Sequence, residues 1–228
     1  MSNTGTLSVV ATPIGNLEDI TLRALRVLKE ADYILCEDTR VTGKLCAHYD
    51  MTTERRRYDA HASARVHKEI LADLAAGRHI ALVSDAGTPG VSDPGVMLIS
   101  MARAAGARIE AIPGPSAVTA AVSIAGLIGN QFSFLGFVPQ KKGRQTFFAE
   151  LADYGHPVVF FESTHRIMKT LEALADLYPE AELRIGRELT KQFEEMITGA
   201  PVDILTILMN DQNKQKGEFV LIFSMPKQ

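Results

Sequence analysis

The run His79–Val83 and the segment Ser84–Gly95 that follows it constrain the fold of this chain most. The run is short, apolar and rich in β-branched residues, which predicts a strand covered on both faces, as strands of parallel sheets are. Ser84–Gly95 (SDAGTPGVSDPG) interrupts this pattern with glycines, prolines and two aspartates before a helical pattern resumes. The segment therefore leaves the carboxyl end of a strand, where open α/β sheets bind their ligands. Its glycines would let backbone amides approach a small polar molecule closely.

The two aspartates of this segment receive different predictions. Asp93 precedes Pro94, and an Asp before a proline at the first helical position is typical of a helix N-cap. We therefore predict that Asp93 caps a helix beginning at Pro94, and that Asp85 binds the ligand. The alternative is that the whole segment is a structural turn.

Strand–loop–helix units surround this segment in the first half of the chain. Apolar runs predict strands over 7–11, 33–36 and 108–112, and helices are predicted over 65–76, over 96–105 and after Thr21, with Leu22, Leu25 and Leu28 as apolar positions. This order predicts a parallel sheet. The loop after the first strand lacks the G-x-G-x-x-G fingerprint, so a dinucleotide site is weakly supported.

Pro113-Gly114-Pro115-Ser116 breaks the regular pattern, and we place a domain boundary there. The predicted domains are 1–113, with a parallel sheet and the central ligand loop, and 114–228, with a mixed sheet. Further strands are predicted over 132–137, 158–161, 183–186, 193–197 and 219–223, and helices over 116–124, 145–152, 201–209 and from about 166 to 177. The predicted fold class is therefore α/β, in two domains.

Composition limits the classes of function. A chain of 228 residues with 46% hydrophobic residues can bury a core. A net charge of −3 gives no general attraction to nucleic acid, so such contacts would need a local patch, and the basic segment Lys141, Lys142, Arg144 is the candidate. Cys36 and Cys46 have no metal-ligand spacing and are predicted to be free thiols, with Cys36 buried in a strand. The start of the chain lacks a signal-peptide pattern and the apolar stretch 117–128 is too short to span a bilayer, so we expect a cytoplasmic protein.

Polar blocks follow three of the predicted strands, at Glu37–Arg40, Glu162–Arg166 and Arg187–Lys191. Each can be interpreted as a helix cap with surface ion pairs, or as part of a ligand crevice. Three such strand ends favour the crevice. If the strands before the last two blocks are neighbours in one sheet, both blocks open on the same side.

Six motifs occur in one order along nearly the whole chain. They are ATPIGNLEDIT (11–21), EDTR (37–40), SDAGTP (84–89), PGPSA (113–117), FESTHR (161–166) and RELTK (187–191). Together they resemble the ribosomal RNA small-subunit methyltransferase I branch of the tetrapyrrole methylase superfamily. The resemblance implies two α/β domains with S-adenosylmethionine in the cleft between them, a homodimer, and 2′-O-methylation of cytidine 1402 in the decoding region of 16S rRNA, within the small ribosomal subunit.

The resemblance also implies roles for residues of the matching motifs. It assigns to the cofactor Pro13, Ile14, Asp85, Ala86, Gly87, Thr88, Ser116, Ala117, Phe161 and Gly186. The first loop, Thr12–Asn16, departs from the G-x-G-x-G-D loop usual in the tetrapyrrole branch and fits the ribosomal branch. Longer members of the family carry a C-terminal extension past the position that matches Gln228.

The chemistry of the reaction suggests the remaining roles. A ribose hydroxyl is a poor nucleophile at neutral pH, so a base or a cation favouring the alkoxide would help, while the sulfonium makes a metal unnecessary. Candidate groups are Glu37, Asp38, Glu162, His165, Glu188 and Lys191, of which we select His165, Glu162 and Lys191 as catalytic. Arg40, Arg166 and Arg187, with Lys141, Lys142 and Arg144, are predicted to hold RNA phosphates.

Two other functions share the predicted cofactor site. A tetrapyrrole methyltransferase acting on a porphyrinogen or precorrin would need cations for the carboxylates of the macrocycle. A non-catalytic nucleotide-binding module would bind the cofactor tightly and transfer nothing. The acceptor of the methyl group distinguishes the three.

Overall fold

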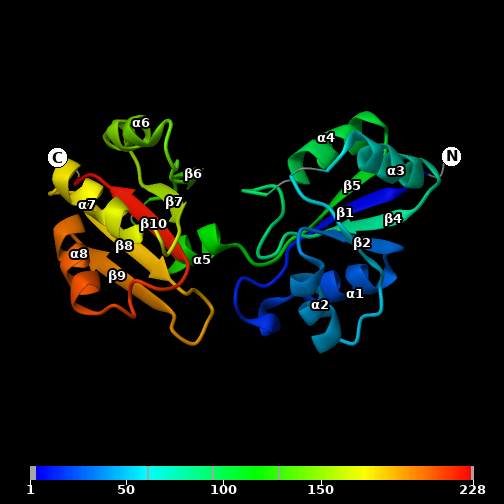
Figure 1. The fold of residues 1–228 in the computed structure, drawn as a ribbon, viewed down its shortest axis with the longest axis horizontal. Coiled ribbons are helices and arrows are strands. Elements are labelled where there is room, and N and C mark those ends of the chain that lie inside the picture. Colours follow the sequence, from blue (N-terminus) through cyan, green and yellow to red (C-terminus); the bar gives the residue numbers. More distant parts are fainter. Residues whose placement is uncertain (1–3, 61, 94, 128, 227–228) are drawn as a thin grey trace. The chain divides into compact units, whose positions relative to one another are not determined.

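The computed structural model describes residues 4–60, 62–93, 95–127 and 129–226, and divides the chain into two compact units, Met1–Ser116 and Ala117–Gln228. Each unit is a five-stranded sheet with helices, so the predicted α/β fold class is confirmed (Figure 1). Among the described residues no helix is long and apolar enough to cross a membrane.

The first unit is a parallel sheet with both faces covered. Its elements are β1 (Thr6–Val10), η1 (Leu17–Asp19), α1 (Leu22–Glu30), β2 (Tyr33–Cys36), α2 (Thr39–His48), β3 (Arg55–Arg57), α3 (Ala64–Ala75), β4 (His79–Leu82), α4 (Gly95–Ala104) and β5 (Arg108–Ile112). The strand order is β3-β2-β4-β1-β5, and every pairing is parallel. Figure 1 shows α1 and α2 on one face, and α3 and α4 on the other. The carboxyl ends of all five strands therefore lie along one edge.

The alternation of side chains along the central strands explains this packing. On β2, Ile34 and Cys36 join the core beneath α1 and α2, while Tyr33 and Leu35 join the core beneath α3 and α4. Successive side chains of a strand point to opposite faces, so a continuous apolar run fits a sheet covered on both sides. Cys36 is buried in this strand and both cysteines are free thiols, as predicted.

The predicted apolar face of α1 is wrong in part. Leu22 is 86% exposed, and the buried residues of the helix are Ala24, Val27 and Leu28. The Thr21 side chain accepts a hydrogen bond from the Ala24 backbone N–H, so Leu22 is the first helical residue. The buried face of the helix therefore begins two residues later, at Ala24. The predicted helix start at Pro94 lies outside the described residues.

The second unit has a mixed sheet. Its elements are α5 (Ala117–Ile124), β6 (Ser133–Phe137), α6 (Arg144–Ala149), η2 (Leu151–Asp153), β7 (Val158–Glu162), α7 (Ile167–Leu177), β8 (Glu182–Arg187), β9 (Glu195–Gly199), α8 (Pro201–Asn210) and β10 (Phe219–Ser224). The order is β6-β7-β10-β8-β9, with β6 and β7 parallel and the other pairs antiparallel. Its core lies between one face of the sheet and helices α6, α7 and α8.

The two polar blocks of the second unit, Glu162–Arg166 and Arg187–Lys191, do not follow neighbouring strands, contrary to the arrangement considered from the sequence. The strands that precede them, β7 and β8, are not adjacent, because β10 lies between them and pairs with both. Both strands run antiparallel to β10, so their carboxyl ends still reach the same edge of the sheet. The beginning of β10 separates the two blocks there.

Candidate functional site

Three loops of the first unit converge at the carboxyl edge of its sheet. Thr12, after β1, and Gly87, after β4, exchange both backbone hydrogen bonds, with N–O distances of 2.9 and 3.0 Å. The Thr88 hydroxyl donates to the Pro115 carbonyl at 3.1 Å. The structure therefore joins the segments that contain Pro13 and Ile14, Asp85–Thr88, and the Pro113–Ser116 motif.

Gly87 allows these loops to meet. Its backbone φ of +78° is one that residues other than glycine rarely adopt. A Cβ atom at this position would also lie 3.3 Å from Cγ2 of Ile14 and 3.8 Å from the Pro115 carbonyl oxygen. Asp85 and Ala86, just before it, are exposed. The loop thus exposes Asp85 and Ala86 to solvent, while its backbone is fixed at Gly87.

The block Glu37–Arg40 after β2 forms a helix cap with an ion pair, which is the alternative to a ligand crevice. Asp38 is the N-cap of α2, where its side chain accepts from the Arg40 N–H at 2.8 Å, and its carboxylate pairs with the Arg40 guanidinium at 2.6 Å. The Asp38 N–H in turn donates to Oδ1 of Asp85 at 3.0 Å. Asp85 is therefore both exposed and bonded to the end of β2. Arg40 is exposed but already carries an acidic partner.

Carboxyl groups gather at this edge and affect one another. Burial raises the pKa of Glu37, and the neighbouring carboxylates of Asp93 and Asp85 raise it further. Burial likewise raises the pKa of Asp93, against a lowering hydrogen bond from Ser84. Hydrogen bonds from Arg40 instead hold the pKa of Asp38 well below its usual range. Glu37 and Asp93 thus favour the neutral form more than ordinary carboxyls do.

In the second unit, the sheet brings two predicted cofactor residues to one row. Phe161 of β7 and Gly186 of β8 both pair with Val220 of β10. Residues paired across a sheet point to the same face, so the two positions share a face two strands apart. Ala117, the remaining predicted contact in this unit, begins α5.

Glu162, predicted to be catalytic, is the acceptor of a buried network. Its side chain has no exposed surface and accepts from the Ser163 N–H at 2.7 Å and the Thr170 hydroxyl at 2.6 Å. Arg166 pairs with it at 2.8 Å, and Arg144 lies 3.6 Å away while donating to Thr170. This geometry favours a structural role for Glu162, with the two arginines as its partners.

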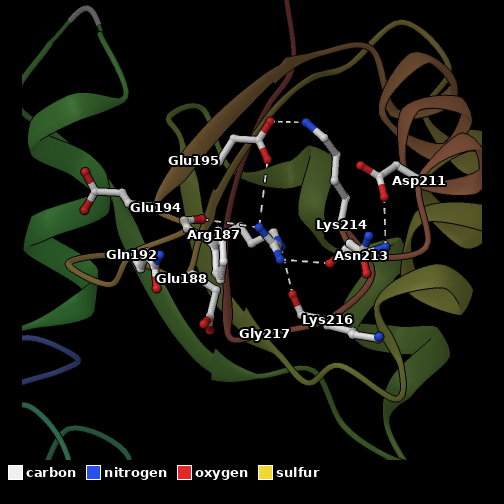
Figure 2. Close-up of a pocket in the computed structure, with 11 residues that line it drawn as sticks. Arg187, Glu188, Gln192, Glu194, Glu195, Asp211, Asn213, Lys214, Lys216 and Gly217 are labelled. Atoms are coloured by element: carbon white, nitrogen blue, oxygen red, sulfur yellow. Dashed lines mark hydrogen bonds and ion pairs between the residues drawn. The ribbon is translucent and has the colours of Figure 1, made fainter.

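Arg187 also points into protein rather than toward solvent (Figure 2). Its guanidinium donates to the carbonyls of Lys216, Asn213 and Phe193 at 2.7, 2.8 and 3.3 Å. These carbonyls belong to the loop after β8 and the loop before β10, which border a pocket of about 900 Å³. The sequence predicts that Arg187 binds RNA phosphates. Its binding to main-chain carbonyls could not be predicted, because every residue type carries a carbonyl and the sequence does not show which ones lie near Arg187.

Lys191 has two acidic partners. Its ammonium lies 2.9 Å from both Glu188 and Glu218. Burial lowers the pKa of Lys191, but the hydrogen bonds to these two carboxylates outweigh it and raise the pKa overall. The amine therefore stays charged and cannot accept a proton. The Thr164 hydroxyl donates to the Gly217 carbonyl, so the start of β10 links the two polar blocks.

His165, Lys141 and Lys142 are the predicted residues of this unit whose side chains are exposed. His165 lies in the turn between β7 and α7, and the two lysines lie in the turn before α6. For these three, no ion pair occurs within the part of the chain that the structure describes. They are available to a ligand.

The loops of the first unit fit S-adenosylmethionine. The exposed Asp85 carboxylate can accept hydrogen bonds from hydroxyl or ammonium groups, and Gly87, which has no Cβ atom, lets the loops after β1 and β4 pair closely through their backbones. Over the described ranges, no group of three or more His, Cys, Asp or Glu side chains is arranged to hold a metal ion.

Comparison with known proteins gives one consistent family. Residues 6–202 match the model of the tetrapyrrole (corrin/porphyrin) methylases. A Neisseria meningitidis protein named ribosomal RNA small subunit methyltransferase I is 47% identical, over 96% of this chain and 75% of the relative. A Thermotoga maritima protein of the same name is 39% identical, over 96% of this chain and 98% of the relative.

Solved structures agree on the fold alone. Uroporphyrin-III-C-methyltransferase from Thermus thermophilus has a TM-score of 0.65 at 21% identity, covering 96% of this chain and 94% of that one. A cobalt precorrin-4 methyltransferase reaches 0.72 at 19% identity, with coverage of 95% and 94%. A diphthine synthase reaches 0.74 at 13% identity, with coverage of 96% and 90%. Enzymes with such different acceptors share this architecture, so the fold does not choose the acceptor.

Proposed function

Because the chain belongs to the tetrapyrrole methylase family, in its ribosomal RNA small subunit methyltransferase I branch, we propose that it methylates 16S rRNA with S-adenosylmethionine. One observation carries this proposal: relatives of that name are 39–47% identical over at least 95% of the chain. We propose the 2′-oxygen of cytidine 1402 as the acceptor, within the small ribosomal subunit.

When bound, S-adenosylmethionine supplies a methyl group on a positively charged sulfur. The chain has to bind this cofactor and orient the acceptor oxygen toward the methyl group. On the first unit, Asp85 would accept hydrogen bonds from polar groups of the cofactor, while Pro13, Ile14, Ala86, Thr88 and Ser116 would line the same loops. Phe161, Gly186 and Ala117 stay predictions from the family resemblance.

The acceptor hydroxyl has to lose a proton as it is methylated. Of the three residues selected as catalytic, His165 is exposed and carries an imidazole, the most common general base in enzymes, whereas Glu162 is enclosed by its own partners and Lys191 stays charged. We therefore propose that His165 accepts the proton of the acceptor hydroxyl. Loss of a general base costs about 10²- to 10⁴-fold in rate, so His165→Ala should lower the rate and remove the acidic limb of the pH–rate profile, and an unchanged profile would exclude this assignment.

The cofactor site is tested by Asp85→Ala. We expect calorimetry to show weaker binding of S-adenosylmethionine while the variant still folds, because Asp85 is exposed and its removal costs one hydrogen bond from the Asp38 N–H. Glu18→Ala, an exposed acidic residue after the first loop, is the matched control. An unchanged dissociation constant would mean that Asp85 only fixes the end of β2 through Asp38.

The acceptor is tested separately. The protein is incubated with S-adenosylmethionine labelled in the methyl group, together with small ribosomal subunits from cells that lack this methyl group, or with a porphyrinogen. We expect label on the particle alone. Label on the porphyrinogen would establish the tetrapyrrole alternative, and cofactor binding without any transfer would establish the non-catalytic one.

The family resemblance also implies a homodimer, which we propose for this chain. Sedimentation should then give twice the chain mass of 24.9 kDa. A mass of one chain across the working concentration range would exclude it.

A further inference from the structure

Three phenylalanines form a cluster at the edge of the second sheet, which we call the aromatic platform: Phe134 and Phe161, which are half-buried, and Phe137, which is exposed. Phe134 and Phe137 belong to β6 and Phe161 to β7. The Phe161 ring lies 4.9 Å from the ring of Phe134 and 5.2 Å from that of Phe137, centroid to centroid. None of the three belongs to the buried core of the unit, and Phe137 is 53% exposed. Exposing an aromatic ring this far sacrifices burial, so the platform calls for a physical reason.

An irregularity of the backbone creates the platform. In a regular strand, residues three apart point to opposite faces, so Phe134 and Phe137 could not both contact Phe161. Here Phe134 pairs with Val159 and Phe137 pairs with Phe161, so β6 contains one extra residue between the two pairs. Gly136, with φ of +71°, lies in this extra turn of chain. Such irregularities often re-aim a side chain beside an active site.

The platform is continuous with the row that contains the predicted cofactor residues. Phe137 pairs with Phe161, Phe161 with Val220, and Val220 with Gly186. Paired residues share a face, so Phe137 extends this row to the edge of the sheet, next to Phe161. A group stacked on Phe137 would therefore lie beside the position that the resemblance assigns to the cofactor.

Two unpaired cations follow the platform in sequence. Lys141 and Lys142 are exposed, and their ammonium groups make no ion pair with any residue that the structure describes. The segment that carries them is anchored at both ends: Arg166 donates to the Val138 carbonyl at 2.7 Å, and the Arg144 N–H donates to the Lys141 carbonyl at 3.2 Å. Both arginines are partners of buried Glu162. The network thus fixes the backbone of the segment between Phe137 and α6, which carries both lysines.

We propose that the aromatic platform stacks an unpaired base of the RNA substrate, with Phe137 as the stacking ring and Lys141 and Lys142 on the adjacent phosphates. The proposal rests on the proposed function and names its recognition surface. An aromatic face accepts any base, while lysines beside it select a polyanion. A protein partner would more often cover such rings with apolar groups, and free lysines are depleted from the cores of protein interfaces.

The test compares Phe137→Ala with Phe137→Tyr, which keeps the ring, and with Phe193→Ala, which removes another phenylalanine, 64% exposed and outside the platform. For each variant we measure KM with small ribosomal subunits, affinity for a fluorescent single-stranded oligoribonucleotide, and cofactor affinity by calorimetry. We expect Phe137→Ala to raise KM and weaken oligonucleotide binding about 5- to 100-fold. Phe137→Tyr and Phe193→Ala should stay within about twofold of the parent.

Salt dependence separates the base from the phosphates. Stacking on a ring releases no counterions, so Phe137→Ala should leave the slope of log affinity against log salt unchanged. Replacing both Lys141 and Lys142 with Ala should reduce that slope by about 1.4, since each phosphate contact on single strands contributes about 0.7.

Three results would overturn the proposal. One is parental RNA affinity in Phe137→Ala. Another is a loss of cofactor affinity in step with KM, which would assign Phe137 to the cofactor. The third is a sedimenting mass of Phe137→Ala that differs from that of the parent protein, which would identify the platform as a protein interface. If the parent protein transfers no methyl group to any RNA, the proposed function fails, and oligonucleotide binding by Phe137→Ala still decides the platform.

Discussion

Glu162, which the sequence analysis predicts to be catalytic, is the buried acceptor of a hydrogen-bond network in the structure. It ends a strand and precedes a histidine and an arginine, as a catalytic carboxylate could. Its oxygens are instead taken up by Ser163, Thr170 and Arg166. A buried charge is tolerated only with such partners, so removing it leaves the arginines uncompensated.

We therefore expect Glu162→Ala to destabilise the protein by about 3–5 kcal/mol in urea unfolding. Glu162→Gln keeps the hydrogen-bonding shape and should cost less. Glu172→Ala, an exposed position on α7, is the control and should stay within about 0.5 kcal/mol of the parent. If Glu162→Ala abolishes methyl transfer while the unfolding free energy stays at the parental value, Glu162 is catalytic after all.

Glu37 should make stability depend on pH. Its pKa is raised from an ordinary 4.5 by burial and by the carboxylates of Asp93 and Asp85. Above the ordinary value, the unfolded chain loses this proton while the folded protein still holds it, so folding stability falls as pH rises through the raised pKa. Below the ordinary value both states are protonated, and the contribution is fully present.

Glu37→Gln removes the ionisation and should raise the melting temperature near pH 7, with little effect near pH 4. Melting curves across this range measure it, and Glu172→Gln, at an exposed position, should show no such trend. An equal effect of Glu37→Gln at both pH values would mean that its ionisation is not the cause.

At the scale of elements, Arg187 is the clamp between two loops of the second unit. One guanidinium binds the Phe193 carbonyl, six residues away along the chain, and the carbonyls of Asn213 and Lys216, which are 26 and 29 residues away. Lysine lacks this forked geometry. Arg187→Lys and Arg187→Met should therefore cost about 2–4 kcal/mol of unfolding free energy and loosen the two loops in hydrogen exchange.

Lys216→Met is the matched control for the clamp. Lys216 contributes only its main-chain carbonyl to Arg187, and its side chain is exposed, so the variant should keep parental stability. If Arg187→Met loses RNA affinity at unchanged stability and exchange, Arg187 contacts RNA as the sequence analysis predicted.

The elements that the sequence misses have weak side-chain signals. β3 consists of three arginines, and its pairing with β2 depends on backbone groups at the sheet edge. α2 contains Gly43 and few apolar residues, and only its cap, Asp38, marks its start. By contrast, β2 and β4 are apolar on both faces and were predicted within one residue. Burial leaves a pattern in sequence, whereas backbone pairing does not.

The candidate site was predictable to the same extent. Loops after β1 and β4 meet because parallel strands end at one edge, which element order alone predicts. The partners of Arg187 and the aromatic platform were not predictable. The first depends on carbonyls, and the second on one extra residue in β6, which reverses the face that alternation assigns to Phe137.

At the scale of the whole molecule, the proposed enzyme combines a cofactor site, a proton acceptor and an RNA-binding surface. Its net charge of −3 makes general attraction to RNA weak, so binding must come from local groups such as Phe137, Lys141 and Lys142. The small ribosomal subunit should then be recognised at an unpaired base and at the phosphates beside it.

Mapping the transferred methyl group on the rRNA tests the proposed function. Small ribosomal subunits from cells lacking the modification are incubated with the protein and labelled S-adenosylmethionine, and the rRNA is digested and analysed by mass spectrometry. We expect one methyl group per particle, on the ribose of cytidine 1402, where it blocks alkaline cleavage of the following phosphodiester. A methyl group on a base or at another nucleotide would contradict the proposed function. So would the absence of any methyl transfer to RNA.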